Sequence, residues 1–179
     1  MTVGRASVLR AALLASVFGL LAPPVRGEQP AADGWRPFTA TWTLTGHRDV
    51  LPTEGERPAS VVNLSGPLTL TSGEGLGRGL LGQLIGFDDG GTMLVGRAVF
   101  TDEHGDHVYA AVSAQPIGAG RKATATLTGG TGRFAGIEGS FSFSWEYVLH
   151  PESGDIDGRI TDLQGRTRIG RSAPGERPR

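Results

Sequence analysis

One carboxylate, Glu146, stands inside an alternating run of aromatic residues and is the first candidate for chemistry. Phe143, Trp145 and Tyr147 share one face of the expected strand, and Glu146 shares the other face with two serines. Two interpretations stay open. In one, the aromatic side chains fill a barrel interior and Glu146 faces water. In the other, they pack between subunits and Glu146 lines a polar lumen, where a desolvated carboxyl suits proton transfer near neutral pH.

Arg97 is the second candidate because apolar residues occupy both faces of the segment around it, 92–101. An arginine in that setting is either paired with an acid or directed into a lumen, where it can bind a carboxylate or enolate oxygen. An ion pair between Arg97 and Glu146 is one hypothesis. These two residues are the predicted catalytic pair.

The segment 102–107, with the sequence DEHGDH, places His104 and His107 beside carboxylates. Imidazole and carboxylate ligands together suit zinc or a related ion. A third ligand would have to come from elsewhere, such as His47 or His150, and nothing in the spacing indicates one. Because polar residues are also typical of a hairpin tip, we predict a solvated turn and no metal.

The elements that must position these residues are strands. Apolar and polar residues alternate along about eight segments joined by short turns, with no amphipathic helix between them. This pattern predicts an all-β sandwich or barrel, and we favour an antiparallel closed β-barrel because closure removes exposed edges. The expected strands are 38–45, 62–71, 84–87, 92–101, 107–114, 122–128, 141–149 and 156–169.

A glycine-rich motif, TGGTGRFAGIEG at 128–139, lies between two of these strands. Glycine at this density marks places where the backbone needs positive φ or approaches another backbone closely. We expect the motif to turn a corner of the sheet, with Phe134 anchoring the turn to the barrel. Arg133 can contact an anion through its guanidinium, although such arginines more often bond nearby carbonyls or a neighbouring strand.

This motif, continued as SFSF and preceded by a threonine-rich strand, resembles the glycine-rich segment of allene oxide cyclase-like and dirigent-like barrels. The resemblance implies an eight-stranded antiparallel barrel with a lumen, often assembled into oligomers. Family members include cyclases and proteins that control a coupling reaction. The residues that carry over are fold-forming ones: Gly129, Gly130, Gly132, Phe134 and Gly136.

Several classes of protein are excluded by composition and spacing. The chain of 179 residues contains no cysteine, so it has no disulfide, zinc–thiolate site or thiol catalyst. Its net charge of −1 provides no field for nucleic acid. The spacing of Gly77, Gly79 and Gly82 matches a dinucleotide fingerprint, but the helix that must follow is missing from the pattern. We predict a loop over a barrel mouth there, and no cofactor.

The chain divides into four parts. Residues 1–27 resemble a cleaved signal peptide, because arginines precede an apolar run that is too short to span a membrane. A flexible lead-in at 28–36, a barrel domain at 37–170 and a disordered basic tail at 171–179 follow. We therefore expect a secreted or periplasmic protein.

Two functions follow from this organisation. In the first, the lumen binds a small apolar molecule against Trp42, Phe143, Trp145 and Tyr147, and steers a cyclisation or a stereochemical outcome by orientation. In the second, the barrel is filled, and the protein is a non-enzymatic envelope or interaction module. A homo-oligomer is compatible with either function.

Overall fold

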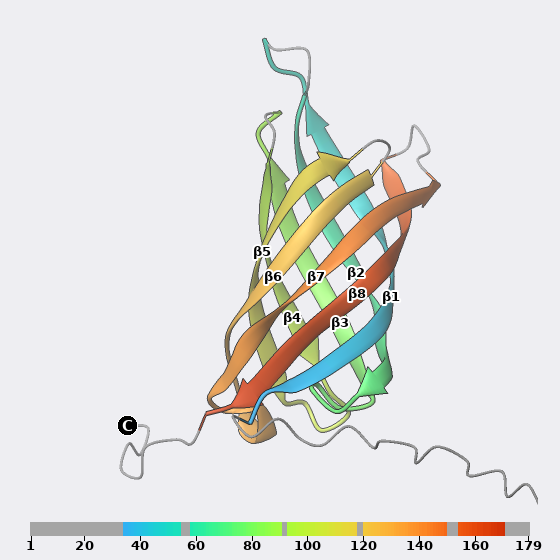
Figure 1. Cartoon of the computed structure of the whole chain (residues 1–179). Helices are drawn as coiled ribbons and strands as arrows, with labels where there is room; N and C mark the ends of the chain where they lie inside the picture. The colour runs from blue at the N-terminus through green and yellow to red at the C-terminus, as the bar shows by residue number, and fades with distance from the viewer. Residues whose placement is uncertain (1–33, 55–57, 91–92, 118–119, 150–153, 171–179) are drawn as a thin grey trace, which may run out of the picture.

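The computed structural model describes residues 34–54, 58–90, 93–117, 120–149 and 154–170. Within them the chain forms a closed barrel in which each strand pairs antiparallel with the next, and β8 pairs with β1 (Figure 1). The strands are β1 (Arg36–Leu51), β2 (Ala59–Gly73), β3 (Gly79–Asp88), β4 (Leu94–Thr101), β5 (His107–Ile117), β6 (Gly120–Gly130), β7 (Ile137–Leu149) and β8 (Asp155–Ile169).

The closed barrel confirms the predicted fold and rules out the open sandwich. Alternation sets the two faces of each strand, because successive side chains of a strand point to opposite sides. Along β1 the apolar residues Phe38, Ala40, Trp42 and Leu44 are buried, while the threonines between them are exposed. Most strands extend beyond their predicted limits, and β3 begins at Gly79, well before the expected start at 84. β4 is the exception, because it begins at Leu94 and not at the expected 92.

Aromatic rings fill the middle of the barrel. Trp42 lies with its ring centroid 5.0 Å from that of Phe100, and Phe141 packs on Phe100 and on Phe38 at 5.8 and 6.0 Å. Gly82 provides the room, since a Cβ there would lie 2.5 Å from the Trp42 ring. Burying each ring contributes about 1.5–3 kcal/mol, so these layers stabilise the fold strongly.

The glycine motif closes the end of the barrel at which β6 leads into β7, the lower end in Figure 1. Its centre is a 3-10 turn, η1 (Gly132–Phe134), which buries the Phe134 ring in the core. Gly129, Gly132 and Gly136 have φ values of 143°, 49° and 74°, in the region that favours glycine. The motif is therefore a corner of the sheet anchored by Phe134, as predicted.

The segment that contains Gly77, whose spacing to Gly79 and Gly82 matches a dinucleotide-binding fingerprint, also lies at the lower end of the barrel. It carries Leu76, which is fully buried in the core. Gly79 and Gly82 belong to β3, so a strand and not a helix follows Gly77.

The predicted signal peptide at 1–27 and the basic tail at 171–179 lie outside the described residues. In the part of the chain that is described, no helix has the length and apolar character of a membrane span.

Candidate functional site

The opposite end of the barrel, where β1 leads into β2 and β3 into β4, contains an apolar cavity inside the lumen. The space that the centre of a water-sized molecule can reach there is about 40 Å³. A buried water needs roughly 10–15 Å³ on this measure, so the cavity holds a few atoms of a guest. Its walls are Leu44, Val62, Leu64, Leu84, Leu94, Val112, Ala114, Arg121, Ala123, Phe143, Trp145, Tyr147 and Ile156.

A wider and more polar space adjoins this cavity towards the end of the barrel. It measures about 260 Å³ in the same way, and Val62, Leu94, Arg121 and Tyr147 line both spaces. The name upper lumen is used below for the two spaces together. A molecule bound in the upper lumen would have its apolar part deep in the barrel and its polar part at the end.

A buried ion pair lines the wider space, and its arginine also lines the apolar cavity. Arg121 begins the inward-facing series of β6, with Ala123 and Ala125, and Asp88 ends the inward-facing series of β3. Arg121 Nη2 donates to Asp88 Oδ2, and the Gly90 N–H donates to Asp88 Oδ1 over 3.1 Å. The side chains of Arg121 and Asp88 are 17% and 7% exposed, so both charges are largely removed from water.

Arg121 retains one unused donor. Its Nη1 atom is buried, and no acceptor for it exists among the described residues. A buried donor without an acceptor costs about 1–3 kcal/mol relative to its hydrated state. An oxygen that reaches this edge of the guanidinium would remove that cost.

The predicted ligand-binding residues lie in and directly below the upper lumen. Phe143, Trp145 and Tyr147 line it, with the last two rings in an edge-to-face contact at 5.6 Å. Trp42 belongs to the filled layer beneath and does not line the cavity, but its ring contacts that of Phe143 with the centroids 6.0 Å apart. Gly158 allows Trp145 its position, because a Cβ at residue 158 would overlap the indole ring.

No family model matches the chain, and no curated protein matches it. In fold, the chain is similar to dirigent proteins. The pterocarpan synthase dirigent protein GePTS1 aligns with a TM-score of 0.43 and 16% identity, over 87% of this chain and all of the other. The pterocarpan synthase dirigent protein PsPTS1 aligns with a TM-score of 0.41 and 16% identity, over 75% of this chain and 97% of the other.

The predicted catalytic pair does not lie in the lumen. Glu146 is on the outer face of β7, where it accepts a hydrogen bond of 2.9 Å from Arg159 of β8. Arg97 is on the outer face of β4 and bonds the Gly96 carbonyl. Since β4 and β7 are not neighbours, the hypothesised pair between them is not formed. The interpretation in which Glu146 faces water is the one that the structure shows.

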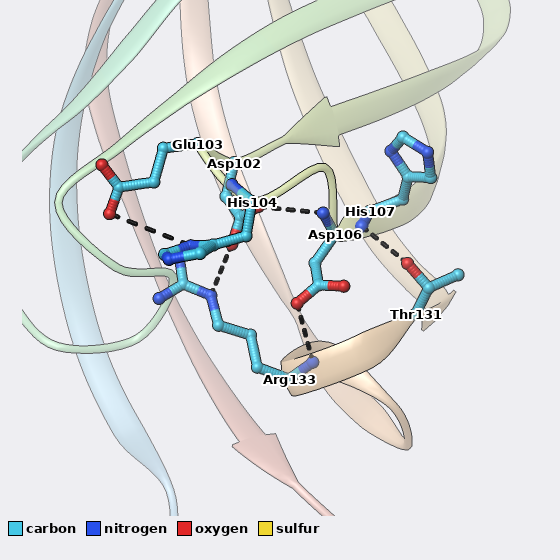
Figure 2. A network of polar contacts seen from close by, with 7 residues as sticks. All are labelled: Asp102, Glu103, His104, Asp106, His107, Thr131 and Arg133. Carbon is cyan, nitrogen blue, oxygen red and sulfur yellow. Dashed lines mark hydrogen bonds and ion pairs between the residues drawn. The ribbon is translucent and has the colours of Figure 1, made fainter.

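The histidine-containing turn between β4 and β5 forms a network that binds the glycine motif (Figure 2). The buried Asp102 carboxylate accepts the N–H groups of His104 and Asp106 at 2.8 and 2.9 Å, and Arg133 Nε lies 2.6 Å from its second oxygen. Asp106 in turn accepts the Arg133 N–H at 3.0 Å. Arg133 therefore serves the turn structurally, but its guanidinium pairs with the Asp102 carboxylate and not with the carbonyls that were expected.

The charge state of Asp102 follows from this network. Burial raises the pKa of Asp102, but the N–H donors of Asp106 and His104 and the Arg133 guanidinium together lower it below its ordinary value of 3.8. The carboxylate is thus ionised wherever the protein is folded near neutral pH. Among the described residues, no three histidine or acidic side chains gather as a metal site.

Sequence reasoning missed the buried ion pair, although a signal for each partner existed. Asp88 directly follows the strand predicted at 84–87, yet it shares the parity of Leu84 and Gly86 on β3. Arg121 precedes the strand predicted at 122–128, yet it shares the parity of the buried alanines of β6. Extending each alternating pattern by one residue would have placed both charges inside the barrel.

Proposed function

We propose that this barrel binds a small, mostly apolar molecule in the upper lumen. The observation that carries the proposal is the apolar cavity itself, which continues into a wider polar space at the buried Arg121–Asp88 pair. Ligand sites of proteins combine these two features, an apolar pocket and a few polar groups that fix orientation. A filled barrel would need neither feature.

Any reaction in such a site would rest on orientation and exclusion of water. The rigid rings of Trp145 and Phe143 form one wall, and a guest held against them has few accessible conformations. Restricting a reactive molecule in this way favours one cyclisation or one stereochemical outcome without a cofactor. A stereocontrol or cyclase role is therefore the finer form of this proposal.

The proposal is tested by filling the cavity from one strand. Ala114 of β5 is buried and lines it, whereas its neighbour Ser113 is exposed on the outer face. Small molecules that copurify with the protein are identified by native mass spectrometry. We expect Ala114→Leu to lose them and Ser113→Leu to keep them. Retention by both variants, in folded protein, would exclude the upper lumen as the site.

A second candidate function rests on the outer face of β2, β3 and β4. Val61, Phe87 and Val95 form one cross-strand row of exposed apolar side chains, and Ile85 and Leu81 extend it along β3. Contiguous exposed apolar surface is typical of protein–protein contacts. On this candidate the protein is an interaction module, and a second copy of the chain is the partner to test first. Sedimentation of the wild type and of Ile85→Glu distinguishes an assembly that needs this row from a monomer.

Export is part of the proposal and is supported by the sequence of residues 1–27 alone. The measurement is the intact mass of the protein recovered from the periplasm or the medium. A mass that includes residues 1–27 would contradict cleavage.

A further inference from the structure

The apolar outer face of β2, β3 and β4 contains one exposed cation. Val61, Phe87 and Val95 form its first row, and two residues further along the strands Ile85 of β3 lies opposite Arg97 of β4. Arg97 donates to the carbonyl of the residue before it over 3.2 Å, and no carboxylate of the described residues pairs with it. An arginine set among exposed apolar side chains is typical of the residues that anchor protein–protein interfaces.

An exposed anion lies on the other side of the same face. Asp49 of β1 pairs with Val61 of β2 in the strand ladder, so it continues the row of Val61 and Phe87. Its side chain is 82% exposed, and the described partner of its carboxylate is His47 Nε2, 3.6 Å away in solvent. The face therefore has a cation at one side, an anion at the other and apolar side chains between them.

Phe87 is nearly equidistant from the two charges. Arg97 is one strand and two residues away from it, which corresponds to about 8 Å between the two positions. Asp49 is two strands away in the same row, which corresponds to about 10 Å. When two such faces meet about a two-fold axis that runs along the surface at Phe87, Arg97 of each copy comes to lie opposite Asp49 of the other.

We infer that two copies of this chain associate through this face about such an axis, with Arg97 of each copy paired with the partner's Asp49. The inference rests on the second candidate function and names its partner and its contacts, and it is independent of the lumen site. Phe87 packs on the partner's Phe87, and Val61 lies towards the partner's Ile85.

The occupant is a second copy because the face itself carries both charges that the contact needs. In a two-fold contact each complementary pair occurs twice, once at each side of the axis. Such a contact is also closed. It covers the apolar surface in a dimer and leaves none of it for a third copy.

The experiment reverses each charge and measures association by sedimentation equilibrium across the micromolar range. Arg97→Asp and Asp49→Arg each place like charges opposite each other at both sides of the axis. We expect each single variant to weaken the dimer by about 10-fold or more. Lys122→Asp is the matched control, because it reverses an exposed charge on the outer face of β6 and should leave the dimer unchanged.

Rescue separates a broken pair from a damaged fold. In an equimolar mixture of Arg97→Asp and Asp49→Arg, each mixed dimer has an acid opposite an arginine at both sides of the axis. We therefore expect the mixture to recover the association that each variant alone has lost. The double variant Arg97→Asp/Asp49→Arg should recover it as well. Circular dichroism confirms that each variant is folded.

The remaining outcomes overturn the inference at different levels. A wild type that stays monomeric overturns it together with the second candidate function, and leaves the lumen site standing. A dimer that Ile85→Glu dissociates but neither charge reversal weakens keeps the outer face as an interface and overturns the pairing of Arg97 with Asp49. Charge reversals that no mixture rescues overturn the direct pairing, and an assembly larger than a dimer overturns the two-fold arrangement.

Discussion

Arg121 and Asp88 form an ion pair across the interior of the barrel. Arg121 is the second residue of β6, and Asp88 is the last residue of β3. The two strands are not hydrogen-bonded to each other, because β4 and β5 lie between them. The pair therefore ties two distant parts of the wall together at the end that holds the apolar cavity.

Removing one partner of this pair should be far more damaging than removing both charges. Asp88→Ala leaves the buried Arg121 guanidinium without its anion, and we expect a loss of about 3–5 kcal/mol in the free energy of unfolding. Arg121→Met/Asp88→Asn should lose less than the single variant does. Urea denaturation measures both, and a double variant that loses as much stability as Asp88→Ala, or more, would contradict a coupled, buried pair.

Gly158→Ala should disturb the upper lumen through Trp145. The added Cβ overlaps the indole ring, so the ring must move, at a cost of about 1–3 kcal/mol for overpacking. We expect a lower unfolding midpoint and altered tryptophan fluorescence. Gly79→Ala is the matched control, because its Cβ would meet only the Leu68 carbonyl, 4.0 Å away. Equal effects of the two substitutions would show that the Trp145 contact is unimportant.

Phe134→Ala should destabilise the fold by about 3–5 kcal/mol, since it empties a site in the core at the lower end of the barrel. Val148→Ala, on the outer face of β7, is the control and should change the stability little. Thermal unfolding measures both variants. A small loss for Phe134→Ala would mean that the glycine motif turns the chain without anchoring it.

The Asp102 network predicts a specific acid sensitivity. Because the pKa of Asp102 is lower in the folded than in the unfolded state, its contribution to stability is present above the ordinary value of 3.8 and is lost as the pH falls through the folded value. Asp102→Asn should reduce the stability at pH 7 and flatten its decline in acid. Urea midpoints between pH 7 and pH 3 provide the test, and an unchanged acid profile in the variant would count against this role.

The strands could be predicted because alternation is a local property. Phe38, Trp42 and Phe141 each lie in a run whose polar and apolar residues alternate, so the run alone predicts which side chains share a face. It left open which face of 141–149 points inwards, and closure of the barrel decides that. The corner at Phe134 was likewise predictable, because the glycines that turn the chain are its neighbours in sequence.

The site could not be predicted from the sequence in the same way. It depends on how the barrel closes and on how deep in the lumen each side chain lies, and neither is a local property of the chain. Trp42 and Trp145 both point inwards, yet only Trp145 lines the cavity, because the tilt of the strands places the two rings at different heights. The partner of Arg121 lies on a strand that it does not touch. Arg97 looked buried because its strand is apolar on both faces, but the outer apolar face of β4 is exposed beside it.

The most direct test of the central claim is methyl NMR of the protein during titration with phenylacetate and, separately, with the neutral 2-phenylethanol. We expect shifts for the methyl groups of Leu64, Leu84 and Val112, which line the upper lumen, and none for Leu68 in the filled core below. Shifts confined to Ile85 and Leu81 on the outer face, or no shifts with either probe, would contradict a ligand site in the upper lumen.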